Sequence, residues 1–231
     1  MHRIVTKLGD NMEKIITQLK EWSFLQNLEP EFAGFMLTTE LMQCDSQYRI
    51  FTYHNAAKYR SFSVLYDEAT KEFLVRVVVG LTEMCDISFI VSDLPGLEQL
   101  LKIRMKDTIR KLAAFDETTL CSSFREKKIT DWSFGTQLPQ QVAGFELYIT
   151  PLQPVKSLNG SYIIIDYSDF LLDSNLLIYY NIYRDEFFGE LRVRRTPRVI
   201  STFDTKQLSE LEQCLKIHLE TILTELRLEL T

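Results

Sequence analysis

The chain has 231 residues, of which 45% are hydrophobic and 25% are charged, and this composition excludes collagen-like, low-complexity and disordered classes of protein. The net charge of −6 disfavours nonspecific binding to nucleic acid, which depends on neutralising phosphates, and the presence of only 8 glycines disfavours glycine-rich phosphate-binding loops. The sequence has no apolar run long enough for a signal peptide or a membrane span, so it predicts a soluble cytoplasmic protein without membrane association.

The first half of the chain is predicted to fold as a short helix, an antiparallel β-meander and a long helix. Apolar residues from Met12 to Trp22 recur at helical spacing, and Asp10 or Asn11 can cap this first helix. Apolar residues from Leu94 to Leu112 predict the long closing helix. Period-two runs joined by short connections predict antiparallel strands between the helices. These strands are expected at residues 34–41, 48–53, 61–66, 72–79 and 87–91.

The second half repeats this order of elements. A weaker apolar stripe with Leu120, Phe124 and Ile129 predicts a first helix capped by Asp116. A strong stripe from Leu208 to Leu226 predicts the closing helix. Five strands are expected between them, at residues 144–150, 162–167, 176–183, 189–194 and 198–202.

Short phrases of sequence recur in both halves. Glu21-Trp22-Ser23-Phe24 returns as Asp131-Trp132-Ser133-Phe134, and Ala33-Gly34-Phe35 returns as Ala143-Gly144-Phe145, both 110 residues later. Residues 97–103 (LEQLLKI) return at 211–217 (LEQCLKI), 114 residues later. Such an offset indicates a duplicated structural unit.

The expected fold is therefore α+β, with internal duplication of a helix, antiparallel β-meander and long-helix unit. The two similar units, residues 1–115 and 116–231, are expected to be related by a pseudo-twofold. The retained Trp and Phe are interpreted as apolar anchors of the core, and the retained Gly as a residue that lets the backbone pass close to them. The sequence leaves open whether the two sheets are separate or continuous.

The sequence contains no motif that names a catalytic, cofactor or metal site. The three histidines are His2, His54, which is expected on a loop, and His218, and none belongs to a known catalytic signature. The four cysteines lack metal-ligand spacing and are interpreted as reduced thiols: Cys44, Cys85, Cys121 and Cys214. The acidic segment 166–169 lacks the Gly and terminal Glu of a calcium loop and is interpreted as a solvated hairpin turn.

Two features of the second half are candidate binding surfaces. Arg192 and Arg194 alternate with apolar residues, so both side chains should leave the same strand face and bind carboxylates or phosphates. The alternative is a solvated strand face that protects a sheet edge. Six of the ten tyrosines lie in the second predicted sheet, which indicates either a recognition surface or ordinary sheet packing. The candidate ligand- or partner-binding residues are Tyr167, Tyr179, Tyr183, Arg192 and Arg194.

These observations favour a non-catalytic protein-binding or adaptor/chaperone-like module whose partner is another protein. The helix–sheet–helix units are broadly similar in architecture to secretion-chaperone-like domains, although no motif matches. The alternative is a small-ligand binder or enzyme with a site in the cleft between the repeats. A nucleic-acid-associated protein is disfavoured by the acidic charge, and the sequence is compatible with a homodimer.

Overall fold

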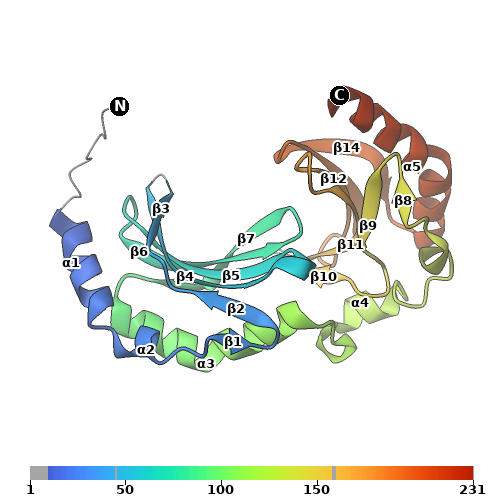
Figure 1. Ribbon diagram of the computed structural model, residues 1–231. Coiled ribbons are helices and arrows are strands. Elements are labelled where there is room, and N and C mark those ends of the chain that lie inside the picture. Colours follow the sequence, from blue (N-terminus) through green and yellow to red (C-terminus); the bar gives the residue numbers. More distant parts are fainter. Residues whose placement is uncertain (1–9, 45, 158–159, 231) are drawn as a thin grey trace. The chain divides into compact units, whose positions relative to one another are not determined.

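The computed structural model describes residues 10–44, 46–157 and 160–230 (Figure 1). It is an α+β structure with two seven-stranded antiparallel sheets, each followed along the chain by a long helix. The residues fall into two compact units. The first contains the chain up to Val77 together with Cys85–Ala113, and the second contains Val78–Met84 together with the chain from Ala114 onward.

The first sheet has the strand order β1-β2-β4-β5-β6-β7, with β3 paired to β4. All five strands predicted in this half are confirmed, whereas β1 and β3, of two and three residues, were not predicted. His54 lies within β4, so the prediction that it lies on a loop is wrong. The elements are α1 (Asp10–Lys20), α2 (Ser23–Gln26), β1 (Glu31–Phe32), β2 (Phe35–Thr38), β3 (Met42–Cys44), β4 (Gln47–Asn55), η1 (Ala56–Lys58), β5 (Arg60–Asp67), β6 (Glu72–Val79), β7 (Thr82–Val91) and α3 (Leu94–Ala113).

The second sheet has the equivalent order, β8-β9-β11-β12-β13-β14, with β10 paired to β11. The five predicted strands are again confirmed, and the two-residue strands β8 and β10 were not predicted. The elements are η2 (Glu117–Thr119), α4 (Ser122–Glu126), η3 (Phe134–Gln137), β8 (Gln141–Val142), β9 (Phe145–Ile149), β10 (Val155–Lys156), β11 (Ser161–Asp169), β12 (Ser174–Asn181), β13 (Glu186–Val193), β14 (Thr196–Thr205) and α5 (Leu208–Leu230).

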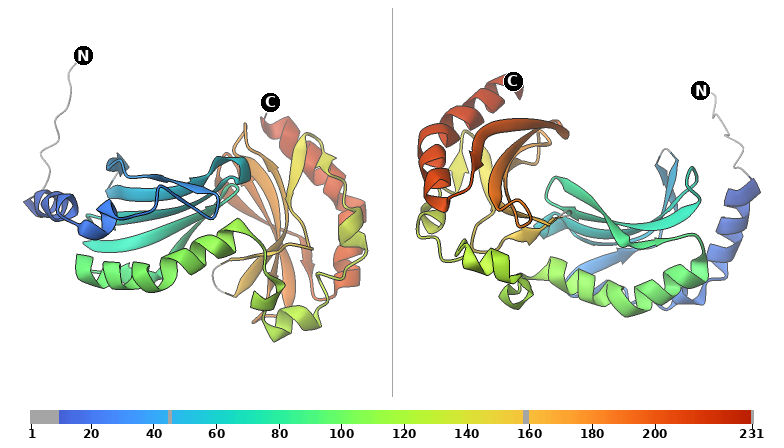
Figure 2. Two further views of the ribbon diagram at one scale, coloured as in Figure 1. Left: turned by 60° about the horizontal axis from the view of Figure 1, so that its bottom comes forward. Right: turned by 180° about the vertical axis from the view of Figure 1, so that it is seen from behind.

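A long helix packs on one face of each sheet (Figure 2). The predicted apolar stripes form the contact. The side chains that recur at helical spacing are buried, from Leu97 to Leu112 on α3 and from Leu211 to Leu230 on α5. The α1 helix is also present, although the side chains of the predicted caps Asp10 and Asn11 lie outside the described part of the chain, as does His2. The predicted first helix of the second half is broken. Asp116 accepts a hydrogen bond from the backbone N–H of Thr118 (2.9 Å) and so caps a single 3-10 turn, after which the short α4 begins.

The retained Ala-Gly pair forms a two-residue hairpin turn in each unit. Ala33 and Gly34 have φ of 51° and 80°, and Ala143 and Gly144 have φ of 48° and 84°. In the first unit the turn joins Phe32 to its partner Phe35. Two consecutive positive φ angles define a type I′ turn, whose twist matches that of the flanking strands. The glycine is therefore needed for its backbone angle. The interpretation that it lets the backbone pass close to neighbouring groups is wrong for Gly34, because an added Cβ there would lie 3.6 Å from the nearest atom.

The two retained tryptophans make the same long-range hydrogen bond. The indole Nε1 of Trp22 donates to Glu98 Oε2 (2.6 Å), and that of Trp132 donates to Glu212 Oε2 (3.0 Å). Both rings are buried, at 5% and 6% exposure, as expected for core anchors. The Trp-Ser-Phe phrase opens a helical turn, α2 or η3, and does not lead directly into a strand. In each unit, the bond joins the segment before the sheet to the helix after it.

The strand pairing also agrees between the units. The β4–β5 pair aligns Tyr48 with Tyr66 and has a register shift between residues 49 and 51. The β11–β12 pair aligns Tyr162 with Tyr180 and has its register shift between residues 163 and 165. Each of these positions in the first unit has its counterpart 114 residues later in the second. The 114-residue offset of the sequence repeat therefore extends through the central strands.

We expect Gly34→Ala and Gly144→Ala each to lower the free energy of unfolding by about 1 kcal/mol or more, since alanine is strained at a positive φ. The loss should be larger at Gly144, where an added Cβ would also displace the Arg227 guanidinium, 2.5 Å away. Urea unfolding followed by tryptophan fluorescence measures the free energy of unfolding of each variant. Gly96→Ala is the matched control: no positive φ strains that position of α3, and it should be close to neutral. Equal effects at all three glycines would contradict the turn assignment.

Candidate functional site

The three candidate tyrosines lie in different environments. Tyr167 is fully buried on the α5 side of the sheet, and its hydroxyl donates to the Pro139 carbonyl (2.7 Å). Burial also raises its pKa. Tyr179 is buried on the opposite sheet face, where its ring stacks on Phe188. Tyr183, in the turn between β12 and β13, is 79% exposed. The structure therefore does not gather these tyrosines into one surface.

The two candidate arginines do not share a strand face. Arg192 lies on β13 between two other strands, so the alternative that it protects a sheet edge is wrong. Arg194 lies beyond the end of β13, in a turn, with a φ of 50°, so the prediction of a common face is also wrong. Of the five candidate residues, Arg192 and Tyr179 are brought together, with 3.5 Å between the guanidinium Nη2 and the hydroxyl oxygen.

Arg192 donates several hydrogen bonds within the second unit. Its Nε donates to Glu190 Oε1 (2.6 Å), and its Nη1 donates to Thr82 Oγ1 (3.1 Å) and to the Leu81 carbonyl (3.3 Å). Leu81 and Thr82 belong to the segment Val78–Met84, which is part of the same compact unit. An arginine with these partners has little capacity left for an added carboxylate or phosphate.

A buried polar cluster occupies the same sheet face. Asp166 is fully buried, and its Oδ1 accepts hydrogen bonds from Ser168 Oγ (2.6 Å) and Asn175 Nδ2 (3.1 Å). Asp166 lies in the middle of β11, so the interpretation of segment 166–169 as a solvated turn is wrong for this residue. The signal that identifies the strand is the alternation of Asp166 and Ser168 with Tyr167, directly after three isoleucines.

The Asp166 carboxyl group lacks part of the hydrogen bonding that an ionised form requires. Its Oδ2 has no hydrogen-bond partner, and neither does Oδ1 of the neighbouring Asn175. Burial raises the pKa of Asp166 to about 6, against the lowering effects of the Ser168 and Asn175 hydrogen bonds and of the Arg192 charge. At the equivalent position of the first unit stands Thr52, whose hydroxyl is hydrogen-bonded to Ser63 Oγ (2.8 Å). The first unit thus has a neutral, satisfied pair where the second has a carboxyl group.

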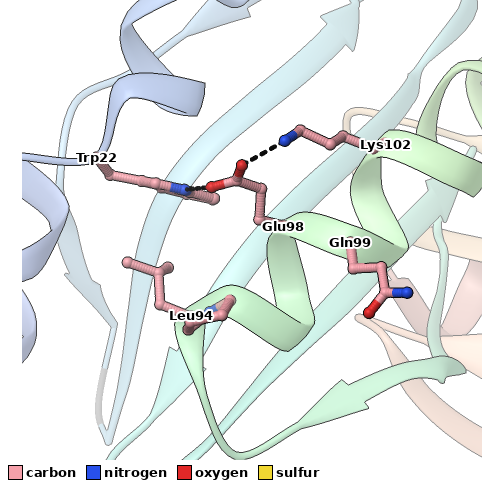
Figure 3. A pocket seen from close by; sticks show the side chains of 6 residues that line it. Trp22, Leu94, Glu98, Gln99 and Lys102 are labelled. Atoms are coloured by element: carbon pink, nitrogen blue, oxygen red, sulfur yellow. Dashed lines mark hydrogen bonds and ion pairs between the residues drawn. The ribbon is translucent and has the colours of Figure 1, made fainter.

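A pocket of about 360 Å³ lies beside Trp22 in the first unit (Figure 3). Glu98 at its centre accepts hydrogen bonds from Trp22 and from Lys102 Nζ, which lies 2.5 Å from Oε1. The Lys102 and Trp22 hydrogen bonds lower the pKa of this carboxyl group, so it is ionised at neutral pH. The lining residues are Trp22, Leu94, Pro95, Glu98, Gln99 and Lys102.

The same residues recur in the second unit. Five of the six lining residues are identical there, the exception being Ser209 in place of Pro95. Glu212 likewise accepts from Trp132 and from Lys216 (2.6 Å). The following helical position is an isoleucine in both units, and Ile103 and Ile217 are each 67% exposed. The five identical residues at the equivalent positions of the second unit are Trp132, Leu208, Glu212, Gln213 and Lys216.

Within residues 10–44, 46–157 and 160–230, no group of three or more His, Cys, Asp or Glu side chains is arranged to hold a metal ion. No helix in the described part of the chain is long and apolar enough to cross a membrane. Comparison of the chain with known protein families, with curated proteins and with solved structures finds no match.

We expect Asp166→Asn to change how stability depends on pH. The folded protein binds the Asp166 proton more tightly than the unfolded chain does, so its contribution to stability is complete below pH 4 and is lost as the pH rises through about 6. A rise in pKa from 3.8 to about 6 corresponds to roughly 3 kcal/mol at most. The free energy of unfolding of the variant should therefore exceed that of wild type at pH 8. The difference between the two should be smaller at pH 4.

Urea unfolding at several pH values measures this difference. Glu220→Gln, which removes an exposed carboxylate on α5, is the control and should leave the pH dependence unchanged. A constant difference between Asp166→Asn and wild type from pH 4 to pH 8 would show that the carboxyl group does not titrate in this range.

Proposed function

We propose that the protein is a non-catalytic protein-binding or adaptor module, built from two tandem α+β repeats at residues 1–115 and 116–231 that arose by internal duplication and are related by a pseudo-twofold. The equal strand orders, the equal registers and the two type I′ turns support the duplication. The two Trp–Glu hydrogen bonds also support it, because each joins residues far apart in the sequence, and chance similarity of short local motifs does not produce the same long-range contact twice.

The observation that carries the binding function is the retention of exposed residues on the two long helices. Buried positions are partly identical between the units, as at Leu97 and Leu211, and partly different, as at Phe51 and Ile165. Several exposed side chains beside the Trp–Glu pairs are identical as well. Exposed positions are ordinarily free to change, because most surface substitutions alter stability by no more than about 0.5 kcal/mol. Their identity in both units therefore indicates a shared role in contact with a partner. The pairs that the Trp–Glu contact does not account for are Gln99 and Gln213, and Ile103 and Ile217.

The chemistry of this surface suits a polypeptide. The Gln amide both donates and accepts hydrogen bonds, as a peptide backbone requires. The exposed Ile offers apolar area to a partner side chain, and the 360 Å³ pocket beside Trp22 is at the small end of the range for bound groups. The carboxylates of Glu98 and Glu212 are both held by Trp and Lys donors, which favours binding over acid–base catalysis.

Two copies of one surface favour a partner that presents two equivalent segments, since the second contact then forms at high effective concentration. The free thiols of Cys85, Cys121 and Cys214 are consistent with a reducing cytoplasm, which we propose as the location. The five residues selected from the sequence, with Tyr167 buried and Arg192 internally paired, are less suited to this contact than the helix surfaces.

We expect Ile103→Glu and Ile217→Glu each to weaken partner binding, and the double variant to weaken it by roughly 100-fold, since both contacts of a bivalent complex are then lost. The partner is first identified by native mass spectrometry of the protein isolated from its source, where a doubled mass would identify a second copy of this chain. Its affinity for each variant is then measured by titration calorimetry.

Ile87→Glu is the matched control for this experiment. Ile87 is an isoleucine with 75% exposure on β7 of the first unit, and the equivalent residue of the second unit is Ser201. It should leave the affinity unchanged. The proposal would be abandoned if the double variant bound as tightly as wild type, or if Ile87→Glu weakened binding as much as Ile103→Glu did.

A further inference from the structure

We propose that the protonation state of Asp166 controls how tightly the segment Val78–Met84 packs within the second unit. The protonated carboxyl group favours the closed packing, and the ionised group favours its opening to water. This regulation of packing is independent of the proposed partner-binding surfaces on α3 and α5.

The segment Val78–Met84 is the end of the β6–β7 hairpin of the first sheet, and it covers the buried carboxyl group. A Cβ built on Gly80 would lie 3.5 Å from Asp166 Oδ2 and 2.6 Å from the Tyr148 ring. Leu81 and Thr82 are buried, at 7% and 2% exposure. Asp166 Oδ2, the oxygen without a hydrogen-bond partner, is therefore the one that faces this segment.

The charged groups around Asp166 do not stabilise its ionised form fully. Arg192, on β13, is the nearby cation, and its guanidinium is already paired with Glu190 of the same strand. Tyr179 of β12 and Tyr148 of β9 are the other titratable groups that face the cluster. On the covering segment itself, Glu83 is paired with Arg195 (3.5 Å). Ionisation of Asp166 thus adds a negative charge to a site whose positive charge is already shared.

Opening of the segment gives bulk water access to Asp166 Oδ2 and so supplies the missing donor. An ionised carboxylate buried with one oxygen unpaired is costly, whereas a protonated carboxyl group carries no charge and needs fewer hydrogen-bond donors around it. Local opening of a few residues is a common way for a folded protein to relieve such a cost. The first unit has no such device at the equivalent position, because Thr52 and Ser63 satisfy one another.

Hydrogen exchange of the amides of residues 78–84 in the full-length chain tests this proposal. After correction for the intrinsic dependence of exchange on pH, protection in the wild type should fall about tenfold between pH 5 and pH 7.5, with a midpoint near pH 6. Asp166→Asn should keep the high protection at both pH values, and Glu220→Gln should behave like wild type. The amides of β5 serve as an internal reference whose protection should not change.

Equal protection of residues 78–84 at both pH values in the wild type would overturn the proposal, and this comparison needs no variant. An equal loss of protection in Asp166→Asn would also overturn it, since the loss would then come from another group. Asp166→Thr, which introduces the residue found at the equivalent position of the first unit, replaces the Asn variant if that variant does not fold. It should likewise remain protected at pH 7.5.

Discussion

A hydrogen bond from a buried indole to a carboxylate on the long helix is the contact on which each unit depends. It joins residues 76 positions apart in the first unit and 80 positions apart in the second, and the whole sheet lies between the joined residues in the sequence. The carboxylate is fixed from its other side by a lysine one helical turn later. A hydrogen bond to a charged group is stronger than a typical neutral one. This contact explains why both halves retain Trp in one phrase and Glu and Lys in another.

The periodic elements could be predicted from the sequence, because burial of one face imposes a visible pattern. The stripes from Leu94 to Leu112 and from Leu208 to Leu226 gave the two long helices, and period-two runs gave the main strands. Strands such as β1 and β8 contain two residues, too few for any period. The partner of Trp22 was not predictable from spacing, although Glu98 lies in the second repeated phrase. The acidic neighbours of Asp166 resemble a turn, whereas its place in β11 is set by the isoleucines before it.

The two units keep the same scaffold but differ on the sheet face away from the long helix. The first unit has the hydroxyl pair of Thr52 and Ser63 there, and the second has Asp166 with Asn175 and Arg192. A buried carboxyl group with a raised pKa lowers stability at neutral pH, so its presence requires a compensating benefit. We infer a division between the surfaces: the exposed helix residues, common to both units, serve binding, and the polar cluster, specific to the second, responds to pH.

The most direct test of this account is a double-mutant cycle in each unit, with Trp22→Phe and Glu98→Gln in the first and Trp132→Phe and Glu212→Gln in the second. Each cycle isolates the coupling between indole and carboxylate from the separate effects of the two substitutions. A favourable coupling is expected in both units, with the two values similar. A coupling near zero in either unit would contradict it, because that unit would then be held together without the contact that both have retained.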